Sequence, residues 1–246
     1  MCIGEIDMNI QFNNAYLAVK AEMIRDHINR TPKLYRQVHG NRVVIKYRKN
    51  GKVHEMGRVS PSFKEAEVLY YKTKGLKLKL KRLNAIIKGN FNYEVRTDIK
   101  NSFDRAFYES LNSNISNEDG KHPYRHKEFY MRSRFELAMA GVLDELELDY
   151  KYEPGVMIGG YLMSPDFVVY LPEFDCCLII ECEGMTDNVS YINSNSVKIA
   201  EYLYAGLELG KTLIILQGQK DHMPSTVDMR NAVISAINLI SAFYIN

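Results

Sequence analysis

The sequence predicts a fold of the α/β (α+β) class: a mixed central sheet flanked by helices, preceded by a basic β-hairpin and a helical region. Three observations support this class. Helical and strand patterns follow one another in the order αβββαβα from about residue 132 onward. Two apolar runs, 167–171 and 176–180, have the length and composition of buried strands. Further upstream, Asn50-Gly51 separates two strand-like runs.

The first part of the chain is predicted to contain two helices around a hairpin. Residues 14–29 have helical spacing and stop near Thr31-Pro32. Residues 42–59 form a hairpin whose Asn50-Gly51 turn is of type I′, because this pair tolerates two positive φ angles. Ser60-Pro61-Ser62 then opens a long helix that continues to about residue 88, with Ser60 as the expected N-cap.

The second part of the chain supplies the predicted sheet. After a helical stretch at 97–111 and a loop at 112–120, a helix spans about 132–148 and a short strand ends at Pro154. Strands 167–171 and 176–180 are joined by a short polar connection. A helix from about 192 and a strand at 212–216 follow. Ser225 and Asp228 indicate a capping box at the start of the last helix.

Charge divides the chain. Residues 1–135 hold 27 Lys and Arg against 14 Asp and Glu, whereas residues 136–246 hold 5 against 16. This asymmetry suggests a polyanion-binding part joined to a metal-binding part. We expect a region at 1–115 that binds nucleic acid or a partner and a second domain at 121–246. An acidic face of the same chain or a partner protein is the alternative target for the basic helix.

The cysteines, Cys2, Cys176, Cys177 and Cys182, have no CxxC spacing, and three of them lie in the predicted buried hairpin. They are expected to be small apolar residues of the core in a reducing compartment. The sequence has no apolar run of the length of a membrane span and no secretory signal pattern at its start, so a cytoplasmic protein without membrane contact is predicted.

Three carboxylates stand at the rim of the predicted core: Glu136 on a helix, Asp166 before one strand and Glu181 at the end of the next. If the connection is centred between residues 173 and 174, Asp166 lies directly opposite Glu181, with Cβ atoms about 5 Å apart. Two such carboxylates repel each other unless a cation lies between them. Oxygen ligands of this kind suit Mg²⁺ or Mn²⁺. Asp166 and Glu181, each taken singly, are more often solvated strand ends, but their combination with Glu136 favours a functional site.

These residues carry a resemblance to a known family. The order αβββαβ, Pro165-Asp166 and Glu181 resemble the PD-(D/E)xK phosphodiesterase superfamily, which has the restriction-endonuclease-like fold. The chain is also similar to an uncharacterised bacterial and phage group of that superfamily. The segments that carry this second likeness are 124–127 (YRHK), 132–136 (RSRFE), 164–167 (SPDF) and 181–187 (ECEGMTD).

The chain departs from the family motif at one position. The motif ends in Glu-x-Lys, and its lysine positions or activates the attacking water, but here Glu183 occupies the place of the lysine. In some branches the neighbouring helix supplies the lysine, and Lys198 is the residue at that place. Glu183 could instead bind metal, although its side chain is expected to point to the opposite face of the strand from Glu181.

The resemblance implies a site and a mechanism. Asp166, Glu181 and the carbonyl of Cys182 would bind the metal, Glu136 would hold water or a second ion, and Lys198 would orient the water or stabilise the charge on phosphate. Residues expected to contact nucleic acid are Arg125, His126, Arg132 and Arg134 beside the site, and Lys72, Lys77, Lys79, Lys81 and Arg82 on the basic helix.

The predicted function is that of a metal-dependent nuclease acting on DNA, with RNA as the alternative substrate. Two alternatives stay open. One is a catalytically inactive protein of nuclease fold that binds nucleic acid. The other is a protein that binds a protein or ribonucleoprotein partner, such as an inhibitor from a mobile element. A homodimer is compatible with the sequence and is not predicted by any pattern in it.

Overall fold

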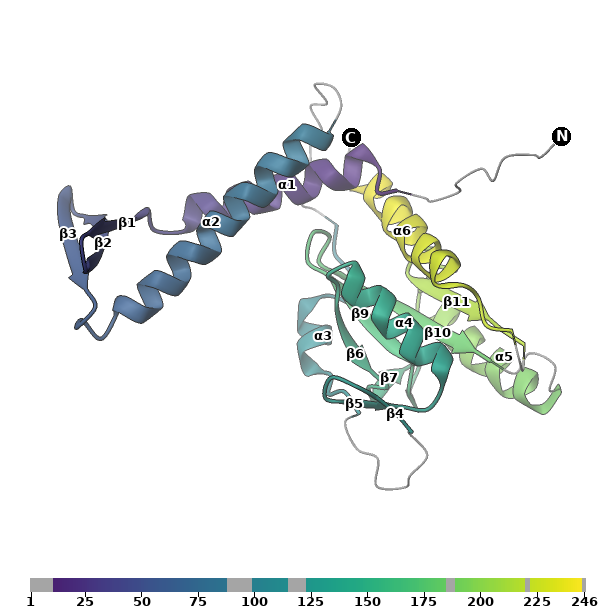
Figure 1. Ribbon diagram of the computed structural model, residues 1–246. Helices are drawn as coiled ribbons and strands as arrows, with labels where there is room; N and C mark the ends of the chain where they lie inside the picture. The colour runs from purple at the N-terminus through teal and green to yellow at the C-terminus, as the bar shows by residue number, and fades with distance from the viewer. Residues whose placement is uncertain (1–10, 88–98, 115–122, 185–188, 220–221, 245–246) are drawn as a thin grey trace, which may run out of the picture. The chain divides into compact units, whose positions relative to one another are not determined.

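The structure is a computed structural model that describes residues 11–87, 99–114, 123–184, 189–219 and 222–244, with the backbone alone for 189–195 (Figure 1). The chain forms two compact units. One comprises Leu17–Tyr93, and the other comprises Met1–Tyr16 together with Glu94–Asn246. The sequence gives the first a formal charge of +14 and the second a formal charge of −12. We call them the basic unit and the acidic unit.

The basic unit contains most of α1 (Asn14–Arg30), then β1 (Leu34–His39), β2 (Arg42–Lys49), β3 (Lys52–Gly57) and α2 (Phe63–Ile86). The strands form an antiparallel sheet in the order β1-β2-β3. Asn50 and Gly51 have φ angles of 51° and 77°, so the predicted hairpin and its turn are confirmed. The sequence did not predict β1.

Helix α2 covers one face of this sheet. Val43 and Ile45 of β2 form a small core with Phe63 and Ala66 of α2. The predicted N-cap Ser60 is wrong. The N-cap is Ser62, whose side chain makes no capping hydrogen bond, while the Ser60 carbonyl accepts a hydrogen bond from the Phe63 N–H at 3.0 Å. The chain makes one more turn after Pro61 before it becomes helical.

The acidic unit is built around a four-stranded sheet in the order β11-β10-β9-β6. Its strands are β6 (Asp149–Tyr152), β9 (Phe167–Leu171), β10 (Cys176–Glu183) and β11 (Leu213–Gln217). β6, β9 and β10 are antiparallel, whereas β10 and β11 are parallel. A mixed central sheet is therefore confirmed. Two short hairpins were not predicted: β4 (Tyr124–His126) with β5 (Phe129–Met131), and β7 (Val156–Ile158) with β8 (Tyr161–Met163).

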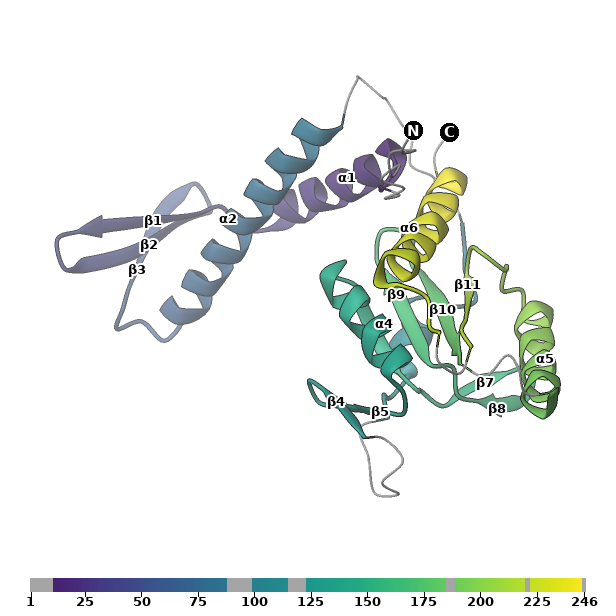
Figure 2. The same ribbon diagram turned by 45° about the vertical axis from the view of Figure 1, so that its right-hand side comes forward.

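Helices lie on both faces of this sheet (Figure 2). α4 (Arg134–Glu145) and α6 (Thr226–Phe243) pack against each other on one face. The other face carries α3 (Arg105–Ser110), α5 (Val189–Tyr204) and the β7–β8 hairpin. On that face Val168 and Ile179 of the sheet share a core with Tyr202 of α5. The predicted capping box of α6 is confirmed, because Ser225 and Asp228 bond to each other's backbone N–H groups.

The bounds of the units differ from the predicted division at residues 115–121. Phe103, Phe107 and Tyr108 pack on the core of the acidic unit, and the Cys177 N–H donates to the Phe103 carbonyl at 2.7 Å. These aromatic residues attach 99–114 to the sheet. Within the described residues 99–111, the predicted helix at 97–111 is limited to α3, and residues 97–98 of this helix and 115–120 of the predicted loop lie outside the described residues.

The start of α1 also belongs to the acidic unit. The Asn13 N–H donates to the Asn238 side chain at 2.9 Å, and the rings of Tyr16 and Phe174 are tilted toward each other with centroids 6.0 Å apart. Cys176, Cys177 and Cys182 are buried and unbridged, as expected of core residues, while Cys2 lies outside the described residues. Across the described ranges, no helix has the length and apolarity needed to cross a membrane.

Candidate active site

The open end of the β9–β10 hairpin brings two of the predicted carboxylates together. Phe167 pairs with Ile180, so the next position in this register sets Asp166 opposite Glu181, as predicted. Asp166 directly precedes β9, and its Oδ2 accepts a hydrogen bond from the backbone N–H of Cys182 at 2.6 Å. This bond closes the hairpin end and fixes the Asp166 carboxylate over the terminus of β10.

Helix α5 supplies two partners for Glu181. Lys198 Nζ lies 2.7 Å from Glu181 Oε2, and the Tyr202 hydroxyl donates to Glu181 Oε1 at 2.6 Å. Lys198 and Tyr202 are four residues apart, so they lie on one side of the helix. Lys198 Nζ also donates to the Ser164 carbonyl at 2.9 Å. Lys198 therefore lies against Glu181 of β10 although it is carried by α5.

Glu136 is held in the first turn of α4. Ser133 caps this helix by accepting a hydrogen bond from the Glu136 N–H at 3.1 Å. Glu136 Oε2 accepts bonds from the Tyr152 hydroxyl at 2.7 Å and from the Arg132 backbone N–H at 3.0 Å. The helix start and the end of β6 thus fix the Glu136 side chain between them.

Arg132 links the carboxylates of this end of the sheet. Its guanidinium lies 3.0 Å from Asp166 Oδ1 and 2.5 Å from Glu153 Oε1. Glu153 has a φ of 41°, in the left-handed region, and its N–H donates to the Asp166 carbonyl at 3.0 Å. The chain therefore turns sharply after β6, and this turn directs the Glu153 carboxylate toward Arg132.

Burial makes this cluster electrostatically unusual. Glu136, Asp166 and Glu181 are 4–6% exposed. Burial, followed by the negative charges of Glu181 and Glu136, raises the pKa of Asp166 to about 8, although the Cys182 N–H and Lys198 oppose the rise. Burial likewise raises the pKa of Glu181 against the opposing effects of Lys198 and Tyr202. For Arg132, burial would lower the pKa, but the surrounding carboxylates outweigh burial and raise it.

Glu183, the second acidic residue after the end of the apolar run, has its partner on β11. It pairs with Gln217 of β11, whose side-chain amide donates to Glu183 Oε2 at 3.2 Å. The side chains of Glu181 and Glu183 lie on the same face of β10, because they are two residues apart. The expectation that they point to opposite faces is therefore wrong, since successive residues, not alternate ones, change face.

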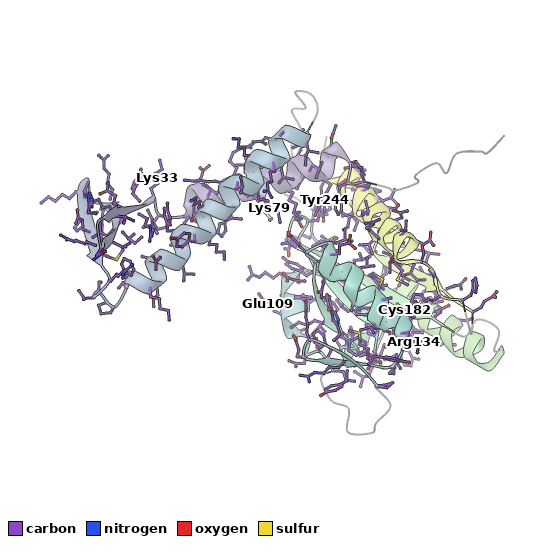
Figure 3. The ribbon with its side chains drawn as sticks, viewed as in Figure 1. Lys33, Lys79, Glu109, Arg134, Cys182 and Tyr244 are labelled. Carbon is purple, nitrogen blue, oxygen red and sulfur yellow. The ribbon has the colours of Figure 1, made fainter. Side chains whose placement is uncertain are left out.

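The β4–β5 hairpin does not bring its cations to the carboxylates. His126 Nε2 lies 2.8 Å from Asp144 Oδ2, in the last turn of α4, whereas Glu136 is in the first turn. Arg125 is exposed, with its guanidinium 6.0 Å from the Tyr130 ring centroid. Arg134 is exposed at the start of α4 (Figure 3). Of the four residues predicted to bind phosphate, only Arg132 lies against the carboxylates of the cluster.

The cations predicted on the long helix all lie on α2 of the basic unit. Lys72, Lys77, Lys81 and Arg82 are exposed, and Lys79, labelled in Figure 3, is partly buried. The segment Met185-Thr186-Asp187, which contributed to the family likeness, lies outside the described residues.

Three residues of the cluster were given no role from sequence. Tyr152 and Tyr202 each donate a hydroxyl hydrogen bond to a carboxylate, and Glu153 pairs with Arg132. A usable signal existed for the tyrosines, because a buried tyrosine hydroxyl normally requires a partner. No local signal distinguished Glu153, whose role depends on a turn with positive φ.

Carboxylates outnumber cations at this end of the sheet. Four carboxylates, Glu136, Glu153, Asp166 and Glu181, lie against two cations, Arg132 and Lys198. Within the described ranges, no three His, Cys, Asp or Glu side chains are arranged to hold a metal ion. The residues that could hold a divalent cation are the opposed pair Asp166 and Glu181 with the Cys182 carbonyl, because such ions prefer oxygen ligands.

Comparisons of the chain with protein-family models, with curated proteins and with solved structures gave no match.

Proposed function

We propose that the protein is a metal-dependent nuclease that hydrolyses phosphodiester bonds of DNA, with RNA as the second substrate. The succession α4, β6, β9, β10, α5 and β11 has the order of the PD-(D/E)xK core, with the β7–β8 hairpin inserted between β6 and β9. In this proposal Asp166 and Glu181 are the two acidic residues of the motif. The order of elements supports the family, and the cluster at the end of β9 and β10 supports the chemistry.

The observation that carries the proposal is the position of Lys198. The motif lacks its lysine because Glu183 stands there, yet Lys198 Nζ lies 2.7 Å from Glu181 after approaching from α5. A lysine at this position can orient an attacking water, and its charge can stabilise the negative charge that develops on the phosphate. A solvated strand end would not require a half-buried lysine from another element.

The metal would be Mg²⁺ or Mn²⁺, held by Asp166, Glu181 and the Cys182 carbonyl. When bound, such an ion polarises a phosphoryl oxygen and lowers the pKa of a water molecule. Glu136, fixed by Ser133 and Tyr152, would accept a hydrogen bond from the attacking water. Arg132 would exchange its carboxylate partners for a phosphate oxygen once the ion neutralises Asp166, because its side chain is 48% exposed.

The test is cleavage of labelled duplex DNA, single-stranded DNA and RNA in Mg²⁺, Mn²⁺ or EDTA. We expect cutting that requires metal, is lost in Asp166→Asn, and falls about 100- to 1000-fold in Lys198→Met. The matched control is Lys211→Met, because Lys211 also pairs with a carboxylate, Glu208, at 2.8 Å but lies before β11 at the other end of the sheet.

A second readout does not depend on turnover. Mn²⁺ titration followed by electron paramagnetic resonance should show one site whose affinity falls at least tenfold in Asp166→Asn and in Glu181→Gln. Wild-type cutting that persists in EDTA would contradict the proposal. So would Mn²⁺ binding unaffected by both substitutions.

One observation favours a second candidate, an inactive protein of the same fold that binds nucleic acid. Each carboxylate already has a protein partner: Asp166 has Arg132, Glu181 has Lys198, and Glu136 has Tyr152. A closed network of this kind holds a site together without metal. Retained binding of nucleic acid together with absent Mn²⁺ binding would favour this candidate over the enzyme.

A further inference from the structure

The outer face of the sheet β1–β3 is a second charged surface, separate from the carboxylate cluster. Side chains of a strand alternate between faces, and α2 covers the face that contains Val43 and Ile45. The opposite face therefore presents Tyr35 and Gln37 of β1, Arg42, Val44, Lys46 and Arg48 of β2, and Val53 and Glu55 of β3.

This outer face is open within its unit. Tyr35 is 56% exposed and Val53 is 58% exposed, and Gln37 and Arg48 are also on the surface. Val44, at the centre of the face, is buried. A sheet with one open face of polar and basic side chains, supported from behind by a helix, is a rigid platform for a ligand.

The charge of the face identifies the kind of ligand. Of the six Lys and Arg on strands β1–β3 and their turns, three lie on the outer face, Arg42, Lys46 and Arg48, against the single acid Glu55. That acid is shared by Lys46 at 2.8 Å and Arg42 at 3.8 Å, so positive charge remains in excess. Arginine and glutamine side chains also have the donors and acceptors that read base edges. The ligand is therefore a polyanion with hydrogen-bonding groups between its charges.

The form of the face favours duplex DNA over single strands. Proteins that bind single strands stack successive bases on several aromatic side chains. Here the outer face exposes only Tyr35 among the large aromatic residues of the described strands, while Tyr47 stacks with His54 at 5.2 Å on the side of α2. Bases of a single strand would have little to stack upon.

The dimensions of the face agree with a groove. Adjacent strands lie about 4.8 Å apart, so two neighbouring strands of the sheet have the width of the ribbon that a major groove accepts. The major groove of B-DNA is about 12 Å wide and admits a two-stranded β-ribbon, whereas the major groove of A-form RNA is too narrow for side chains to read. We propose that the outer face of β1–β3 binds in the major groove of duplex DNA, with Arg42 and Arg48 as its principal donors. This proposal rests on the nucleic-acid part of the proposed function.

The first arm of the test measures binding of the full chain to one fluorescent DNA duplex in EDTA, which prevents metal-dependent cutting. We expect the double variant Arg42→Ala/Arg48→Ala to lose affinity about 10- to 100-fold. Lys64→Ala is the matched control, because Lys64 is exposed on α2, behind the opposite face of the sheet, and we expect less than about a twofold change. Circular dichroism verifies that all variants fold.

The second arm identifies the groove. The same duplex is prepared with glucosylated 5-hydroxymethylcytosine, which fills the major groove without changing charge, or is saturated with netropsin, which fills the minor groove. We expect glucosylation to weaken binding at least tenfold and netropsin to leave it nearly unchanged. Binding that is indifferent to glucosylation, or equal loss in the Lys64→Ala control, overturns the inference.

The outcomes separate this inference from the nuclease proposal. Metal-dependent cutting that is lost in Asp166→Asn, together with binding that ignores the Arg42 and Arg48 substitutions, would retain the enzyme and reject the sheet as its DNA-binding surface. Tighter binding of single-stranded DNA or RNA than of the duplex would reject the major groove as the target.

Discussion

In the acidic unit, Glu136, Asp166 and Glu181 are at most 6% exposed, whereas in the basic unit Arg48, Lys72, Lys81 and most other cations lie on the surface. In the acidic unit each of these three carboxylates accepts hydrogen bonds of 2.6–3.0 Å. The donors are Cys182, Tyr152, Tyr202, Lys198 and Arg132. On α2 of the basic unit, by contrast, cations follow one another along the helix.

The difference shows which charges need a functional explanation. A buried carboxylate loses its hydration, so several of them persist together only where paired groups or a ligand compensate. Exposed lysines are individually nearly neutral for stability, and a surface rich in them becomes useful when a polyanion approaches. The buried carboxylates therefore need the functional explanation that we proposed above, whereas the exposed cations need none for stability alone.

The largest expected effect concerns the exposed charges. If the basic unit makes six or more phosphate contacts, raising the salt from about 50 to about 200 mM lowers the affinity for DNA about 1000-fold, because bound counterions are released. A variant with Lys77, Lys81 and Arg82 all replaced by Ala should have a shallower salt dependence. Fluorescence anisotropy at several salt concentrations measures both slopes. Binding that ignores salt would instead favour a protein partner.

The next effect removes a link in the buried cluster. Arg132→Ala leaves Asp166 and Glu153 without their shared cation, and we expect unfolding to become easier by about 1–3 kcal/mol, less than for a fully buried pair because the Arg132 side chain is 48% exposed. Urea denaturation in EDTA measures the change. The neighbouring exposed Arg134→Ala is the control and should shift stability by no more than about 0.5 kcal/mol. Equal losses in both would show that the cluster is not a stabilising network.

A smaller effect has the opposite sign. The pKa of Asp166 in the folded chain, about 8, lies above its ordinary value of 3.8, so the folded state holds a proton that the unfolded chain releases. The contribution of Asp166 to the free energy of unfolding in EDTA should therefore be largest below about pH 4. It should fall as the pH rises toward 8. Asp166→Asn should remove this dependence and stabilise the metal-free protein at pH 8 by about 1–2 kcal/mol. Thermal unfolding at several pH values measures it.

Asp144→Asn is the matched control for this sign. Burial alone would raise the pKa of Asp144, but hydrogen bonds from Lys127 and His126 outweigh burial and lower it. Its contribution is therefore present above the ordinary pKa and lost on acidification, and replacing it should destabilise the protein at neutral pH by at most about 1 kcal/mol. If both substitutions move stability in the same direction, burial of charge is not what distinguishes Asp166.

The smallest effect compares helix starts in the two units. Ser225 caps α6 with a full capping box, whereas the side chain of Ser62 makes no capping hydrogen bond to α2. Ser225→Ala should therefore destabilise the acidic unit by about 1 kcal/mol, and Ser62→Ala should have little effect. Urea denaturation of both variants measures the pair. Comparable losses would indicate that Ser62 caps α2 in solution.

The elements that the sequence predicted well depend on local patterns. The apolar runs on either side of residues 172–175 defined β9 and β10, and the short connection between them also set the register that opposes Asp166 to Glu181. Asn50-Gly51 defined the β2–β3 turn, because this pair readily adopts two positive φ angles. The short strands β4, β5, β7 and β8 have three residues each, too few for a period of two to be recognised.

The candidate site was predictable only in part, because its partners come from distant segments. The donor for Glu136, Tyr152, is 16 residues away, and Glu153 reaches Arg132 through a turn whose backbone has positive φ at a residue that seldom adopts it. His126 illustrates the converse. Its sequence neighbours suggested a place beside Glu136, but the β4–β5 hairpin carries it to Asp144.

The acidic unit is discontinuous in sequence, and this has a consequence for how the protein is assembled. Residues 11–16 contact α6 through Asn13 and the β9–β10 connection through Tyr16, and the chain then forms the basic unit before it returns near residue 94. The basic unit is thus an insertion within a host, not a neighbour appended to one end. During synthesis the acidic unit stays incomplete until α6 emerges. All residues of the basic unit are synthesised much earlier, so the basic unit can fold first.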